Sequence, residues 1–227
     1  MAKLTSLVLA FAFWALLHAL VAGAWRGTIA ARTGENGFRI LFSLLSVAGL
    51  VALVRAWRAA PYVEMWAPSP ILMLLPLVLM PFACVFLVAG LSTPSPTAVG
   101  GEGRLKGEAA GIFRVTRHPV LWAFLLWAVS HMAANGDAAA WLFFGAIALV
   151  AVNGMFSIDR KLKARAPEAW SGFARATSLF PLAAIAGGRN RLDLADIGWW
   201  RIALGLALFA LFGAFHQYLF GARPVPF

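Results

Sequence analysis

The chain of 227 residues contains four histidines, and they are its best candidates for binding a metal or moving a proton. Each lies in or at the edge of a long apolar run: His18, His118, His131 and His216. An ionisable side chain is costly in hydrocarbon and usually marks a functional position in a helix bundle. Neutral imidazole is also a common ligand of haem iron and of divalent metals. The alternative for each histidine is a structural role, hydrogen-bonded inside the bundle.

The spacing of the two central histidines separates their roles. His118 and His131 are thirteen residues apart, which on a helix corresponds to a rotation of about 220° after whole turns. They point to nearly opposite faces and cannot bind one metal ion. His118 follows Arg117 at the start of its run, whereas His131 shares a face with Asn135 and Trp127. The sequence has no His-x3-His or Glu-x-x-His pair, which argues against a carboxylate-rich zinc or di-iron site.

Depth in the apolar run suggests which histidines can meet. Measured from the basic residue at the cytoplasmic end of each run, His131 lies roughly 21 Å deep, His216 roughly 22 Å and His18 roughly 12 Å. Depth therefore favours pairing His131 with His216, and pairing it with His18 would need about 9 Å of tilt or displacement. Isolated histidines on separate helices, in a partly aromatic setting, suit a planar macrocycle such as haem b.

Composition identifies the elements that carry these residues as membrane helices. The chain is 62% hydrophobic and 12% charged, and its mean hydropathy is +0.81. Soluble domains have roughly twice that charged fraction. Six apolar runs are long enough to cross a bilayer: 4–24, 39–57, 70–90, 118–135, 138–157 and 200–220. We expect an all-α, polytopic transmembrane bundle of about six spans in a single domain over residues 1–227. The first run is interpreted as a retained span and not as a signal peptide.

Local sequence features predict how the spans are joined. Gly136 suits a left-handed helix end and Asp137 an N-cap, so the fourth and fifth spans should form a tight hairpin. Pro76 and Pro81 predict a kink or break in the third span.

Two further segments fall between the spans. Residues 90–111 are rich in Gly, Pro and Ser and predict a loop with turns. Residues 158–176 combine apolar residues at helical spacing with basic ones and predict an interfacial helix restarted at Pro167. An anchoring role at anionic lipid is the simplest interpretation of that helix.

The basic residues that give the chain its net charge of +10 lie mostly in or beside the loops between these spans. Fifteen basic residues lie in or beside the loops between spans 1–2, 3–4 and 5–6, and four lie on the opposite side. The positive-inside rule places the fifteen in the cytoplasm and both termini outside it. This distribution explains the charge without nucleic acid, and we expect no nucleic-acid partner. The single cysteine, Cys84, lies in an apolar run and implies no disulfide framework.

Three stretches carry a further signal: GLSTPSPTAVG, TRHPVLWAFLLWAVSHMAANGD and GMFSIDRKLKARAPEAWSGFARATSLFP. Together they resemble the NnrU family of bacterial inner-membrane proteins, which is associated with denitrification and nitric-oxide metabolism. The family is similar to plastid 15-cis-zeta-carotene isomerase, a membrane enzyme that depends on haem b held by two histidines. The resemblance implies His18 and His131 as axial ligands, with His216 as the alternative. It also makes Arg117, His118 and Asn135 further candidates for cofactor binding, the first two as anchors for haem propionates.

A more distant resemblance concerns the Arg-His-Pro start of the fourth span. It is similar to the isoprenylcysteine carboxyl methyltransferases, in which this region holds S-adenosylmethionine. Leu121 and Ala123 stand where that family prefers Tyr and Gly, and its acidic position is met by Asp159.

Three functions are therefore open. The first is a haem-b protein of the bacterial inner membrane, acting in denitrification, nitric-oxide metabolism or an isomerase-like reaction. The second is an S-adenosylmethionine-dependent methyltransferase, and the third a cofactor-free scaffold for assembly of a denitrification enzyme. The expected partners are the lipid bilayer and either nitric oxide or a hydrophobic small molecule. No protein partner and no catalytic residue is assigned.

Overall fold

A computed structural model describes residues 2–97, 101–106 and 109–223, and this part of the chain is all-α. The first helix, α1 (Ala2–Leu16), continues as the π-helix η1 (Leu17–Ala24). The other long helices are α2 (Arg26–Ala59), α3 (Pro70–Ser92), α4 (Pro119–Asn135), α5 (Ala138–Arg165) and α9 (Trp199–Phe220). The short ones are η2 (Glu102–Lys106), η3 (Gly111–Arg114), α6 (Pro167–Ala176), α7 (Ala183–Ala186) and α8 (Leu194–Ile197).

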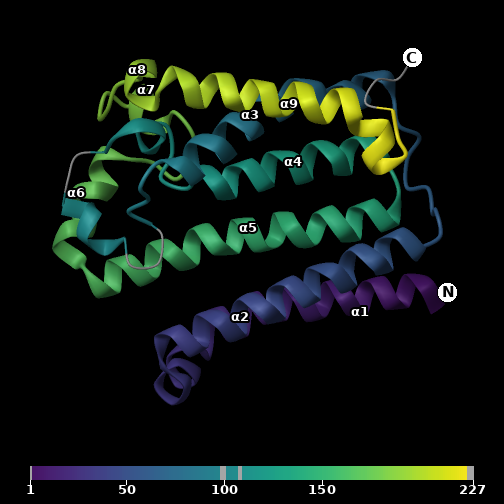
Figure 1. The fold of residues 1–227 in the computed structure, drawn as a ribbon, viewed down its shortest axis with the longest axis horizontal. Helices are drawn as coiled ribbons and strands as arrows, with labels where there is room; N and C mark the ends of the chain where they lie inside the picture. The colour runs from purple at the N-terminus through teal and green to yellow at the C-terminus, as the bar shows by residue number, and fades with distance from the viewer. Residues whose placement is uncertain (1, 98–100, 107–108, 224–227) are drawn as a thin grey trace.

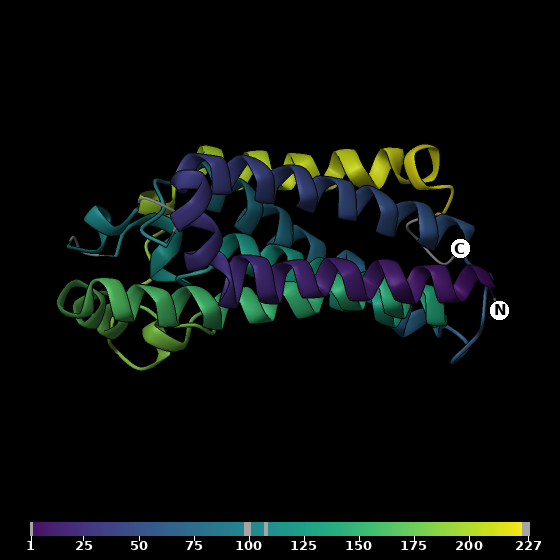
Figure 2. The ribbon, with the colours of Figure 1, turned by 90° about the horizontal axis from the view of Figure 1, so that it is seen from below.

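The long helices form a bundle that fits a membrane protein. Five helices are long and apolar enough to cross a bilayer, and α4 is a shorter apolar helix of 17 residues. They run along one common direction, as Figures 1 and 2 show. The all-α, polytopic architecture with six apolar helices is thereby confirmed.

Helices α2 and α3 differ from the spans expected at their positions, the first in length and the second in continuity. The span expected at 39–57 is part of α2, which has 34 residues and begins at Arg26. Its polar first part bends at Gly34, where φ is 73° and ψ is 162°. The third span does not break at its prolines, because α3 runs as one helix through Pro76 and Pro81. Membrane helices tolerate internal prolines where neighbouring groups satisfy the freed carbonyls.

The connection between α4 and α5 forms as its residues predict. Gly136 ends α4 in the left-handed conformation, with φ at 66°. Asp137 caps α5, because its Oδ1 accepts hydrogen bonds from the amides of Ala139 and Ala140 at 2.9 and 3.0 Å. A side chain at position 136 would collide with the carbonyl of Trp66, so the turn is fixed by packing as well as by conformation.

The two other expected segments are found at the opposite end of the bundle. The basic segment 158–176 is helical in two pieces, the end of α5 and then α6, which restarts at Pro167. In the predicted loop 90–111, α3 ends at Ser92 and only the short helices η2 and η3 follow. Residues 98–100 and 107–108 of that loop lie outside the described residues.

The long helices are arranged on two sides of α5. The hairpin of α1 and α2 packs on one side of α5, and α4, α3 and α9 lie on the other (Figure 1). α1 begins and α9 ends at the same end of the bundle, and α6, α7 and α8 gather at the other (Figure 1). α9 approaches α3 closely at Gly205, where an added Cβ would lie 2.6 Å from the Cα of Val85.

Candidate functional site

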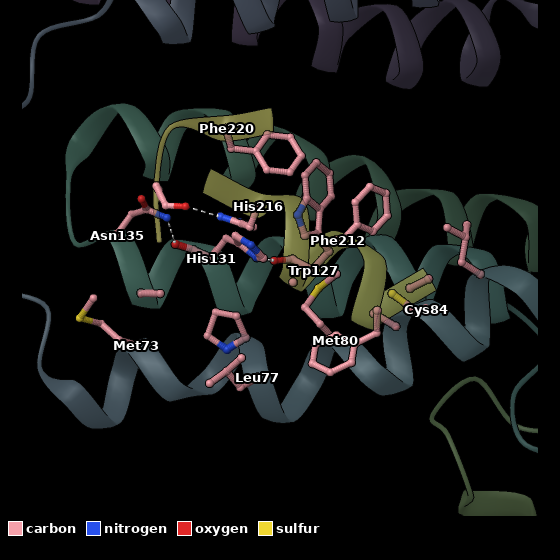
Figure 3. A pocket seen from close by; sticks show the side chains of 18 of the residues that line it. Met73, Leu77, Met80, Cys84, Trp127, His131, Asn135, Phe212, His216 and Phe220 are labelled. Atoms are coloured by element: carbon pink, nitrogen blue, oxygen red, sulfur yellow. Dashed lines mark hydrogen bonds between the residues drawn. The ribbon is translucent and has the colours of Figure 1, made fainter. Parts of the chain in front are cut away.

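His131 of α4 and His216 of α9 face one cavity. Their ring centroids are 6.4 Å apart, with an angle of 25° between the ring planes. The cavity has a volume of about 340 Å³ and lies between α3, α4 and α9 (Figure 3). Trp127 and Asn135 line it with His131, as their helical spacing predicts. The small-molecule sites of proteins begin at about this volume.

Backbone carbonyls orient both imidazole rings. The Nδ1 of His131 lies 2.8 Å from the carbonyl oxygen of Trp127, and the Nδ1 of His216 lies 2.8 Å from that of Ala222. A carbonyl only accepts hydrogen bonds, so Nδ1 carries the proton and donates in each ring. Nε2 of each ring then keeps its lone pair. Metal-binding histidines commonly have this arrangement, with one ring nitrogen held by a carbonyl and the other free to coordinate.

The walls of the cavity are apolar and aromatic. Phe212 and Phe220 of α9 lie near the two histidines, and Met80 and Cys84 come from α3 (Figure 3). Arg223, just after α9, is the lining residue with a permanent charge. Among the described residues, no group of three or more His, Cys, Asp or Glu side chains could hold a metal ion. The site therefore suits a ligand that needs two nitrogen donors and apolar surroundings.

His18 lies elsewhere, in the first helical hairpin. Its Nδ1 is 2.8 Å from the carbonyl oxygen of Trp14, and its ring contacts Trp14 and Phe42 at centroid distances of 4.5 and 5.3 Å. It is not among the described residues that line the cavity of His131. The structure thus brings together the pair that depth favours, while the family resemblance points to His18. Which pair binds a cofactor stays a prediction.

Arg117 and His118 form a separate cluster with Asp159 of α5. The Nε of Arg117 donates to one carboxylate oxygen at 2.9 Å, and the Nε2 of His118 lies 2.7 Å from the other. The guanidinium also lies over the ring of Trp170, 5.4 Å from its centroid. Only 2% of His118 is exposed. A carboxylate that accepts from both neighbours joins α4 to α5 at this end of the bundle.

This cluster is remote from the cavity of His131. Thirteen residues of helix correspond to about 20 Å along the axis of α4, and neither Arg117 nor His118 is among the described residues lining that cavity. Of the further cofactor-binding candidates, Asn135 is the one that the structure brings to His131. Its Nδ2 donates to the carbonyl oxygen of His131 at 2.7 Å.

Two contacts near the histidines are not evident from the sequence. Arg223, which follows the last apolar run, lines the cavity of His131 and His216. Lys161 donates from Nζ to the carbonyl oxygen of Ala22 at 2.6 Å, which ties α5 to the π-helix that contains His18. Neither contact has a sequence signal, because each depends on how separate helices pack.

Comparison with known proteins supplies the context of these sites. The family model described as "NnrU protein" matches residues 6–224. The chloroplastic 15-cis-zeta-carotene isomerase of Zea mays is 33% identical over 84 residues, which are 36% of this chain and 22% of that relative. The match therefore covers about a fifth of the relative's length. No solved structure matches the chain significantly. The resemblance to methyltransferases stays a prediction.

Proposed function

Because the chain belongs to the NnrU family, we propose that this multi-pass membrane protein binds haem b in the cavity of His131 and His216. It acts in nitric-oxide or denitrification chemistry, or in an isomerase-like reaction on a hydrophobic molecule. The location is the bacterial inner membrane, with both termini outside the cytoplasm. The observation that carries the proposal is the pairing of two carbonyl-oriented imidazoles in an apolar, aromatic cavity.

His131 and His216 are the residues that would hold the iron. Their ring centroids are 6.4 Å apart. Both rings keep Nε2 available, since Nδ1 donates to a backbone carbonyl. Neutral imidazole nitrogens are common ligands of haem iron, so this donor set fits the group.

The other residues that line the cavity fit the macrocycle and the carboxylates of haem b. The aromatic side chains Trp127, Phe212 and Phe220 would pack against an apolar macrocycle and keep water away from it. Arg223 would pair with a haem carboxylate at the outer end of the cavity. When bound, haem would supply a redox-active iron able to take up nitric oxide or another small ligand.

The relationship to the isomerase supports an isomerase-like reaction without defining its substrate. The shared segment covers 36% of this chain, and the apolar lining of the cavity suits a hydrophobic molecule or a small neutral gas. Carotene is not carried over as a substrate.

The proposal is tested by absorption spectra of the detergent-purified protein, oxidised and reduced, with a pyridine haemochrome assay. We expect about one haem per chain and reduced spectra typical of two histidine ligands. His131→Ala and His216→Ala should each remove most of the haem, and His18→Ala should keep it.

The same three variants can reject the pairing. Loss of haem in His18→Ala, with retention in His216→Ala, would assign the axial pair to His18 and His131. A colourless protein that stays colourless after haem is added would remove the haem function. A cofactor-free scaffold would then be the better interpretation.

A further inference from the structure

A second cavity lies at the other end of α4 and has no part in the proposed haem site. Its volume is about 530 Å³, within the range of small-molecule sites. It is enclosed by the end of α3, the residues that follow it up to Thr97, the first turn of α4, and Arg104. No lining residue is shared with the cavity of His131 among the described residues.

The first turn of α4 provides hydrogen-bond donors at this cavity. Pro119 is the first residue of the helix, and no side chain caps it. Within the described part of the chain, the amides of Val120 and Leu121 have no hydrogen-bond partner, and both residues line the cavity. The unpaired amides at the start of a helix carry partial positive charge and favour anions.

A buried hydroxyl at the cavity also lacks a partner. The Oγ1 of Thr93 is buried and makes no hydrogen bond with a described residue. His118 lines the cavity and is only 2% exposed, and its Nε2 lies 2.7 Å from a carboxylate oxygen of Asp159. Buried polar groups are nearly always paired, so an unpaired one at a cavity points to a ligand.

The charged groups around the cavity indicate the sign of the charge that its ligand would carry. Arg104 lines it and is exposed. None of its lining residues in the described part of the chain is Asp or Glu. Asp159, the nearby carboxylate, already accepts from Arg117 and His118. A ligand here meets helix amides, a hydroxyl, an imidazole and a guanidinium, with no acidic group to repel it.

We infer that this cavity binds a phosphate group. Phosphate oxygens accept several hydrogen bonds from different directions, as these donors require, and Arg pairs well with them. The Nδ1 of His118 can donate to a phosphate oxygen when the ring is protonated, or accept from a protonated oxygen when it is neutral. Leu91, Leu121 and Ile158 form the apolar wall that would contact the rest of the ligand. The phosphate belongs either to a soluble phosphorylated molecule or to a lipid headgroup.

The test is titration calorimetry of the detergent-purified full chain with two probes. One is inorganic phosphate, and the other is short-chain phosphatidic acid, compared with a diacylglycerol of the same chain length. Thr93→Val removes the hydroxyl and keeps the shape of the side chain, and Arg104→Ala removes the charge. Because a hydrogen bond to a charged group is strong, each change should weaken binding roughly tenfold. Arg191→Ala is the matched control, since the side chain of Arg191 is 79% exposed and it is not a lining residue.

The two probes identify the source of the phosphate. Saturable binding of inorganic phosphate that both variants weaken and the control does not supports a soluble ligand. Variant-sensitive binding of phosphatidic acid, absent with diacylglycerol, supports a lipid headgroup. The inference is overturned if neither probe saturates, or if Arg191→Ala weakens binding as much as Arg104→Ala. It is also overturned if S-adenosylmethionine saturates the cavity and phosphate does not compete. None of these outcomes depends on haem.

Discussion

His118 and His131 are the same residue type on the same helix, but they have different partners. His118 lies at the start of α4, with its Nε2 against the carboxylate of Asp159. His131 lies near the end of α4, with its Nδ1 against a backbone carbonyl. The first ring is joined to a carboxylate that also pairs with Arg117, and the second faces apolar and aromatic side chains.

The partner of each imidazole determines what the ring can do. A carboxylate can balance a charged ring, so His118 can stay buried within an ion-pair cluster. A backbone carbonyl supplies no charge but orients the ring, so Nε2 of His131 is left available for a ligand. One end of α4 is therefore tied to α5 by charge, and the other end is open to a coordinating group.

The largest loss of stability is expected from removing the carboxylate that joins the start of α4 to α5. Asp159→Ala leaves Arg117 and His118 without their shared carboxylate, and their side chains are only 14% and 1% exposed. Removing one partner of a buried ion pair costs about 3–5 kcal/mol. The midpoint of thermal unfolding in detergent should fall sharply.

The matched control for that change is Arg191→Ala. Asp193 pairs with Arg191 at 3.8 Å, and the side chain of Arg191 is 79% exposed. An exposed pair contributes roughly 0–1 kcal/mol, so this variant should unfold almost as the parent does. Equal shifts in the two variants would mean that Asp159 does not hold the charged end together.

An intermediate loss of stability is expected from separating α9, which carries His216, from α3. Gly205→Ala adds a Cβ that would lie 2.6 Å from the backbone of Val85, so α9 must move away from α3. Overpacking of this kind costs about 1–3 kcal/mol, and displacement of α9 should also disturb His216. Unfolding midpoints of the purified variants measure the cost.

Gly213→Ala provides the comparison on the same helix. An added Cβ there meets no atom within 4 Å, so only the gain in helix propensity of about 1 kcal/mol remains. If Gly213→Ala destabilises the protein as much as Gly205→Ala, the close approach of α9 to α3 is not the cause.

The smallest change in stability is expected from a carboxylate outside the core of the bundle. Asp196 Oδ2 accepts from Arg114 Nε at 2.6 Å and from the amide of Gly111 at 2.8 Å. These hydrogen bonds, that of Arg114 first, lower the pKa of Asp196 below its usual value of 3.8. The stabilisation is therefore complete above pH 3.8 and is lost as the pH falls through the lower folded-state pKa.

This contribution should be less than about 1 kcal/mol, because the pair is partly exposed and screened. Unfolding midpoints between pH 6 and pH 3 should fall more for the parent protein than for Asp196→Asn. Parallel curves for the two proteins would contradict the assignment.

The parts that could be predicted are those decided by local chemistry. The turn at Gly136 and Asp137 and the restart at Pro167 follow from residue type alone, and both are confirmed. The length of α2 could not be predicted, since its polar first part resembles a loop. The depth of His216 predicted its proximity to His131. The contact of Lys161 with η1 could not be foreseen, because it depends on how α5 packs against the first hairpin.

The position of α9 in the chain sets an order of assembly. His131 is on α4, and its partner His216 is on α9, the last of the described helices to leave the ribosome. The wall that carries Phe212, His216 and Arg223 therefore does not exist until every other described helix has been made. If the proposed haem is bound there, its loading would follow insertion of these helices, and a chain terminated before α9 would reach the membrane without the wall needed to retain it.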